Sequence, residues 1–197
     1  NMRVNMNKIL ILLSLVLIVS CDSSSTEKMT NNDVVISDLA LNEITIPNTQ
    51  ISISIPVEFT ELALEDIELK WGGNKTAPKW ATGNENMGTT ISYSINLFDA
   101  SEVPLKDVML GMKQGFDRVV PGISWAKNEV INLNGKDWII FEFTSNTIDT
   151  EVHNIMVTTD LGNVMPILNF NSIVNQFEGY ELLLRKGLES VTLSRGQ

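Results

Sequence analysis

The single cysteine of the chain, Cys21, stands at the end of an apolar segment, and this placement constrains what the following residues can fold into. Lys8 precedes the largely apolar run Ile9–Val19, and the small residue Ser20 lies directly before Cys21. A basic start, an apolar run and a small residue at the end are typical of an export signal, which contributes no element to a fold. The run is shorter than the roughly 20 apolar residues of a membrane-spanning helix. We therefore expect the folded part to begin after this segment.

The four residues Ile18-Val19-Ser20-Cys21 resemble the lipobox of bacterial lipoproteins. This resemblance implies that residues 1–20 are a lipoprotein signal peptide, starting at Met2 or Met6, and that Cys21 is lipidated and becomes the acylated N-terminus. The protein is then exported and anchored to a bacterial membrane, facing the periplasm or the cell surface. Each buried methylene of the lipid contributes about 0.8 kcal/mol, so several acyl chains anchor firmly. The alternative is that Cys21 is a small buried side chain and the leader is simply cleaved.

Lipidation of Cys21 leaves no free thiol, which excludes disulfides, CxxC redox motifs and thiolate metal sites. Charge excludes a further class of function. The chain has 14 Lys+Arg against 24 Asp+Glu, and its formal net charge of −10 becomes more negative when Arg3 and Lys8 leave with the leader. Because such a charge repels phosphates and no basic cluster offsets it, we expect no binding to nucleic acid. The acidity either serves solubility alone or forms an acidic docking face.

The residues from the cysteine onward divide into a tether and one domain. Residues 21–40 are rich in serine and other polar residues, which is typical of a flexible linker. Such a linker would hold a domain away from the membrane. Residues 41–197 suffice for a single domain with its own hydrophobic core.

Residue patterns in the first half of this domain predict a hairpin, a short helix and a strand. Isoleucines alternate with polar residues on both sides of Pro47-Asn48-Thr49, which indicates the hairpin. Thr60–Lys70 is predicted as a short helix capped by Thr60, and Gly72–Gly88 as a long loop. Thr89–Phe98 alternates between apolar and polar side chains, so we expect a strand with one solvent-exposed face.

The second half contains the clearest helix and two more hairpins. Ser101–Val120 is amphipathic, with Ser101 as its cap and Pro104 in its first turn. Asn134-Gly135 is a strong hairpin signal, and the strand after it is apolar on both faces, so it should lie in the centre of a sheet. Pro166 has no N–H and should lie at an edge or a bulge. The other predicted elements are the strands Glu129–Leu133, Asp137–Thr144, Val152–Thr159 and Val164–Phe170 and the closing helix Ser172–Ser190.

Strands joined by tight turns, with helices to cover their faces, predict an α+β fold with an antiparallel β-sheet flanked by helices. Several turns and core strands stand at particular points of this order: Ile53-Ser54-Ile55-Pro56, Pro78–Asn84, Asn134-Gly135-Lys136, Trp138–Phe143, Ile148-Asp149-Thr150, His153-Asn154-Ile155-Met156, Asn169-Phe170 and Glu189-Ser190. With them the chain resembles the Mog/PsbP-like fold, as small bacterial lipoproteins carry it. This resemblance implies an α/β/α sandwich and a non-enzymatic binding, assembly or accessory role, with an envelope protein or a small ligand as partner.

Candidate catalytic groups are few. His153, the only histidine, lies close in sequence to Asp149 and Glu151, so an envelope hydrolase is the alternative function. A strand histidine paired with a neighbour is the simpler interpretation. The chain has no EF-hand loop, P-loop or GxGxxG motif, so we expect neither a metal nor another cofactor. A hydrolase would also draw on carboxylates of the predicted short helix, although a solvated face is simpler. These carboxylates are Glu61, Glu65, Asp66 and Glu68.

Trp71 and Trp80 are the candidate ligand-binding residues. They accompany a loop rich in glycine, asparagine and lysine, and an indole offers a large apolar face together with a polar N–H. The two rings would then line a groove. The alternative is that both fold back and cover a face of the sheet, and the residues alone leave both interpretations open.

Overall fold

The computed structural model describes residues 40–72, 77–147 and 150–194. The predicted leader, Cys21 and nearly all of the predicted tether lie outside these ranges. The strands are β1 Leu41–Thr45, β2 Ile51–Pro56, β3 Thr60–Glu61, β4 Trp80–Gly83, β5 Thr89–Asn96, β6 Ser124–Leu133, β7 Lys136–Asn146, β8 Glu151–Thr158, β9 Met165–Ile173 and β10 Thr192–Leu193. The helices are α2 Leu64–Trp71, α3 Leu105–Val119 and α4 Val174–Glu189. None of these helices combines the length and apolarity needed to cross a bilayer.

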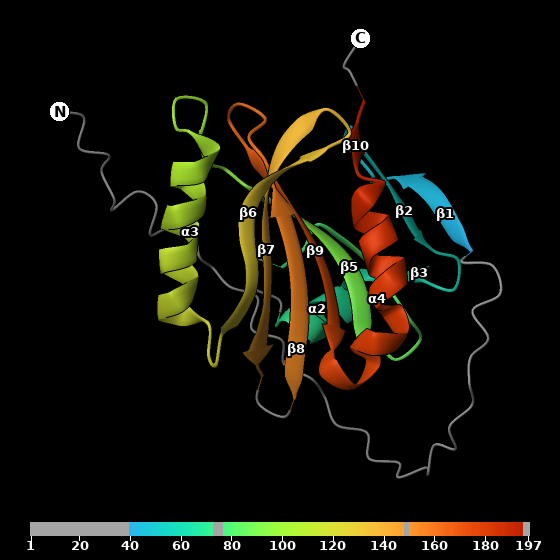
Figure 1. The fold of residues 1–197 in the computed structure, drawn as a ribbon. Coiled ribbons are helices and arrows are strands. Elements are labelled where there is room, and N and C mark those ends of the chain that lie inside the picture. The colour runs from blue at the N-terminus through green and yellow to red at the C-terminus, as the bar shows by residue number, and fades with distance from the viewer. Residues whose placement is uncertain (1–39, 73–76, 148–149, 195–197) are drawn as a thin grey trace.

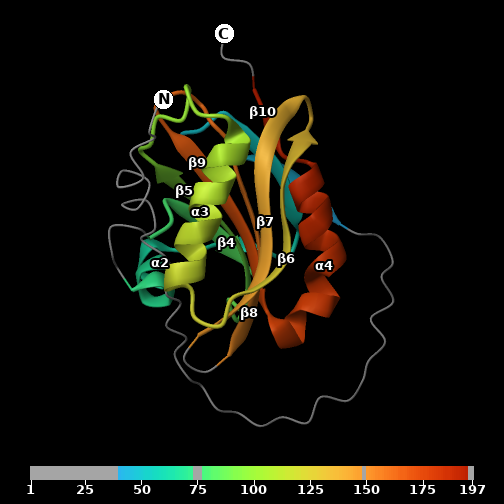
Figure 2. The ribbon, with the colours of Figure 1, turned by 60° about the vertical axis from the view of Figure 1, so that its left-hand side comes forward.

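The described strands form two antiparallel sheets. The larger has seven strands in the order β3-β4-β5-β9-β8-β7-β6, and the smaller has three in the order β1-β2-β10. α4 and the small sheet cover one face of the large sheet, and α3 covers the opposite face over β6 and β7 (Figure 1). α2 lies on the same side as α3, against β4 (Figure 2). The predicted α+β fold with an antiparallel sheet between helices is confirmed.

Strand β7 is buried on both faces, as its sequence predicts. Trp138 and Ile140 belong to the hydrophobic core beneath α4 and β2. Ile139, Phe141 and Phe143 belong to the core beneath α3. Since successive side chains of a strand point to opposite faces, this one strand contributes to both cores.

The turns at the strand ends follow their sequences. Asn134 and Gly135, which join β6 to β7, have φ angles of 49° and 88°. Two successive positive φ angles are what a type I′ turn requires, so the predicted hairpin is confirmed. The hairpins β1–β2 and β8–β9 are confirmed as well.

Two predictions between β2 and β5 are wrong. Thr60 does not cap a helix, because Thr60–Glu61 forms β3 and α2 begins only at Leu64, with no side-chain cap. The predicted loop Gly72–Gly88 contains β4, in which all four residues are buried. A short strand that is buried on both faces shows no apolar–polar alternation, so its sequence carried no strand signal.

The predicted solvent-exposed face of β5 is also wrong. Thr90 and Ser92, assigned to that face, are buried. The exposed apolar side chains are Ile95 near the end of the strand, at 42%, and Leu97 just after it, at 85%. β5 is an inner strand between β4 and β9, and its buried Thr90 hydroxyl bonds to Asn171 Oδ1 of β9.

The predicted starts of α3 and α4 and the predicted position of Pro166 at a sheet edge also differ from the structure. Ser101 does not cap α3, since its Oγ donates to Asp99 Oδ1 at 2.6 Å and Pro104 is the N-cap. α4 begins at Val174 because β9 runs on to Ile173. β9 is central rather than at an edge, but Pro166 lies near its start, where the pairing with β8 has not yet begun.

Two fully buried threonines give a stability prediction. Thr82 Oγ1 donates to the carbonyl oxygen of Thr60 at 2.9 Å, whereas Thr158 Oγ1 has no partner in the described part of the chain. Thr82→Val should lower the free energy of unfolding by about 1 kcal/mol, because it removes the hydrogen bond from a fully buried hydroxyl. Thr158→Val should leave it unchanged or raise it. Urea unfolding of both variants is the measurement, and equal losses in the two would contradict the prediction.

Candidate functional site

A buried carboxylate joins the large sheet to α4. Glu142 of β7 is 6% exposed, and its Oε1 lies 2.9 Å from His153 Nε2 of β8 and 2.7 Å from Arg185 Nη2 of α4. Arg185 also donates from Nη1 to Glu142 Oε2 at 3.3 Å and from Nε to Glu181 Oε1 at 2.8 Å. Glu142 and His153 meet because they are diagonal neighbours on adjacent strands. We call Glu142, His153, Arg185 and Glu181 the ion cluster.

His153 is held from two sides within this cluster. Its ring stacks on Phe177 of α4, with the ring centroids 3.6 Å apart and an interplanar angle of 16°. Its Nε2 faces the carboxylate of Glu142. The stack and the hydrogen bond fix the His153 ring, and together they position α4 on the sheet. This agrees with the simpler interpretation, in which His153 is a strand histidine paired with a neighbour. The other groups of the hydrolase alternative do not join it, because Glu151 is exposed at the start of β8 and Asp149 lies outside the described residues.

The ion cluster keeps Glu142 charged. The hydrogen bond from His153, followed by those from Arg185, lowers the pKa of the Glu142 carboxyl from 4.5 to about 2, although burial acts in the opposite direction. The hydrogen bonds to Glu142 and then Glu181 raise the pKa of Arg185. Neither Glu142 nor Arg185 belongs to a motif in the sequence. The available signal was a charged residue inside the otherwise apolar run Trp138–Phe143.

Acid should weaken the fold through Glu142. A carboxyl whose pKa is lower in the folded state contributes stability above its unfolded pKa, near 4.5, and that contribution is lost as the pH falls toward 2. Glu142→Gln should therefore lower the free energy of unfolding at pH 7 by about 2 kcal/mol, the scale of a hydrogen bond to a charged group. It should also flatten the acid limb of the stability curve. Urea unfolding at a series of pH values measures both effects.

The control for this prediction is Glu129→Gln. Glu129 pairs with Lys127 at 2.8 Å, but both side chains are about half exposed. Exposed pairs contribute little, so this variant should lose at most about 0.5 kcal/mol and keep the acid limb of the wild type. An acid limb that is the same in Glu142→Gln as in the wild type would contradict the assignment.

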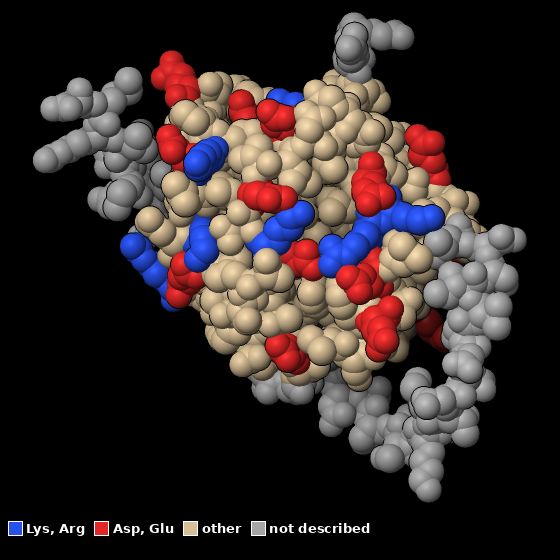
Figure 3. Space-filling model, viewed as in Figure 1, with Lys and Arg blue, Asp and Glu red and all other residues tan. Residues whose placement is uncertain are grey.

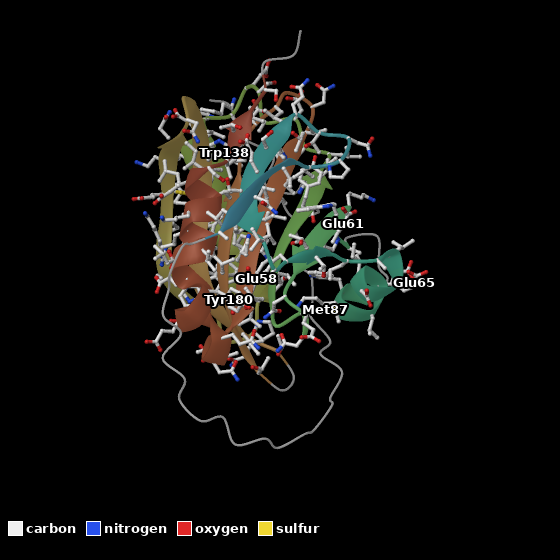
Figure 4. The ribbon with its side chains drawn as sticks, turned by 90° about the vertical axis from the view of Figure 1, so that its right-hand side faces the viewer. Glu58, Glu61, Glu65, Met87, Trp138 and Tyr180 are labelled. Atoms are coloured by element: carbon white, nitrogen blue, oxygen red, sulfur yellow. The ribbon has the colours of Figure 1, made fainter. Side chains whose placement is uncertain are left out.

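The predicted cluster of carboxylates is divided between two elements. Glu61 lies on β3, so it is not on the helix, while Glu65, Asp66 and Glu68 lie on α2. Glu61 and Glu65 are at one margin of the molecule (Figure 4), and both are exposed. On the face shown in Figure 3, lysine and arginine side chains lie among the acidic ones rather than in a patch of their own.

Trp71 and Trp80 are both buried, at 1% and 5% exposure, and the structure does not bring them together. Trp80 belongs to the core beneath α4. Trp71 packs with Ile67 against Ala81 on the other side of the sheet. Because residues 80 and 81 are successive in β4, their side chains point to opposite faces. Each indole thus covers its own sheet face, and the two do not line a common groove.

The fold is similar to those of two proteins of known structure. The cyanobacterial PsbP protein CyanoP from Synechocystis matches with a TM-score of 0.57 at 10% identity, over 83% of this chain and 98% of that chain. LpqN of Mycobacterium tuberculosis, described as involved in cell envelope biogenesis, matches with a TM-score of 0.53 at 12% identity, over 79% of this chain and 91% of that chain. No protein-family model and no curated protein sequence matches the chain. The fold is PsbP-like, as the sequence resemblance implied.

Proposed function

We propose that the protein is a lipid-anchored accessory module of the bacterial cell envelope, which binds a partner or ligand and does not catalyse a reaction. The observation that carries this proposal is Cys21, the only cysteine, which is the last residue of the lipobox-like segment Ile18-Val19-Ser20-Cys21. A polar stretch follows it, and the PsbP-like domain comes next. The likeness to LpqN, described as involved in cell envelope biogenesis, supports the envelope setting.

The ion cluster argues against the hydrolase alternative, because the fold itself already uses the His153 ring. A general base must reach the proton that it removes, with a nucleophile or water at hydrogen-bond distance. The His153 ring instead lies between Glu142 and Phe177, where the structure uses it to hold α4. Glu61 of β3 and Glu65 and Glu68 of α2 are exposed, so water surrounds and screens their charges, and they form no enclosed pair of carboxylates.

Lipidation of Cys21 is tested by the intact mass and membrane fractionation of the native protein. The wild type should carry a lipid-sized added mass and sediment with membranes, and Cys21→Ala should lose both, because the sequence has no other thiol on which the lipid thioether could form. Ser20→Ala keeps a small residue before the cysteine and serves as the control that is still lipidated. Wild-type protein that is unmodified, soluble and cleaved elsewhere would overturn the proposal.

A further inference from the structure

The turn between β6 and β7 holds the end of α4. Asn134 Nδ2 donates to the carbonyl oxygen of Glu189 at 2.9 Å and to that of Val191 at 2.8 Å. Glu189 is the last residue of α4, and Val191 lies directly before β10. Figure 1 shows the turn beside β10, at the end of the molecule where α4 stops. We call these two hydrogen bonds the Asn134 clasp.

The clasp depends on the amide form of the Asn134 side chain. Carbonyl groups at the end of a helix have no partner within the helix and need donors from elsewhere. A side-chain amide supplies two N–H groups, whereas an ionised carboxylate only accepts hydrogen bonds. A carboxylate in the same place would face the carbonyl oxygens of Glu189 and Val191 and repel both. Loss of the amide therefore opens the clasp.

The sequence of the turn permits loss of this amide with water as the only reactant. Asn134-Gly135 is the only Asn-Gly pair in the chain, and glycine has no side chain to hinder attack by its backbone nitrogen. A bond forms between Gly135 N and Asn134 Cγ while the bond from Cγ to Nδ2 breaks. The amide proton of Gly135 leaves with Nδ2 as ammonia, and a cyclic imide remains. One water molecule then opens the imide to aspartate or isoaspartate, and both residues are exposed to water.

The folded turn restrains both of the groups that react. Nδ2 of Asn134, which must leave, is held by the two carbonyl oxygens of the clasp. The N–H of Gly135, which must lose its proton, donates to Asn132 Oδ1 at 3.0 Å. The φ angles of 49° and 88° hold the backbone of Asn134 and Gly135 in the type I′ turn. Cyclisation therefore requires that the clasp and the turn open first.

We propose that Asn134 is a deamidation site, at which the reaction makes an opened clasp unable to close again. The aspartate product lacks the two donors, and the isoaspartate product adds a methylene group to the main chain of a two-residue turn. Neither product restores the contact with the end of α4. The reaction thus converts a transient opening at this end of the domain into a permanent one. The inference is independent of the binding role proposed above.

Peptide mass spectrometry of the mature, lipidated protein in detergent micelles measures the reaction. During incubation at mildly alkaline pH, in urea that unfolds the domain, Asn134 should deamidate faster than any other asparagine of the chain. Without urea its rate should fall at least about tenfold, the equivalent of one hydrogen bond that must first be broken. A smaller fall, or no reaction of Asn134 in urea, would overturn the proposal.

Two aspartate variants test whether the reaction releases α4. Asn134→Asp has the side chain of the aspartate product and should lower the Tm by about 4–8 °C, twice the shift expected from one lost hydrogen bond. Asn48→Asp is the matched control, because Asn48 is an exposed turn residue with a φ of 60° whose side chain makes no hydrogen bond among the described residues. It should keep the wild-type Tm within about 2 °C. Equal losses in both variants, or a loss in neither, would overturn the proposal.

Discussion

Burial of β7 on both faces is the constraint on which the rest of the structure depends. Its alternate side chains enter two separate hydrophobic cores, so α3 on one side, and α4 with the small sheet on the other, are both required to cover it. A strand of this kind must lie inside a sheet, and β6 and β8 flank it accordingly. The layered arrangement follows from the apolar strand β7, because both of its faces must be covered by other elements to be removed from water.

The two faces of the large sheet use polar residues differently. Beneath α4, the buried charge of Glu142 is balanced by His153 and Arg185, and it fixes a helix to two strands. Breaking such a pair is costly because the remaining charge stays buried. On the opposite face the buried polar side chains of β5, β8 and β9 carry no charge; they are Thr90, Ser92, Asn154 and Asn171. The first arrangement fixes a helix to the sheet, and the second joins neighbouring strands, as the hydrogen bond from Thr90 of β5 to Asn171 of β9 shows.

Sequence reasoning succeeded where the signal is local. The Asn134-Gly135 turn and the apolar strand after it were predictable, because neighbouring residues alone determine the turn conformation and the apolar character of the strand. β4 was missed because a four-residue strand buried on both faces does not alternate. Glu142 and Arg185 are 43 positions apart, and Ser92 meets Asn169 only through the strand register, so neither contact has a sequence pattern of its own.

The central claim is that both faces of β7 are needed for the fold, and urea unfolding of Ile140→Ala and Phe141→Ala tests it most directly. Ile140 belongs to the core beneath α4, and Phe141 belongs to the core beneath α3. The account predicts that each variant lowers the free energy of unfolding by about 2–5 kcal/mol, because each leaves a cavity in its own core. A loss of less than about 1 kcal/mol in either variant would show that one face of β7 contributes little and would contradict the account.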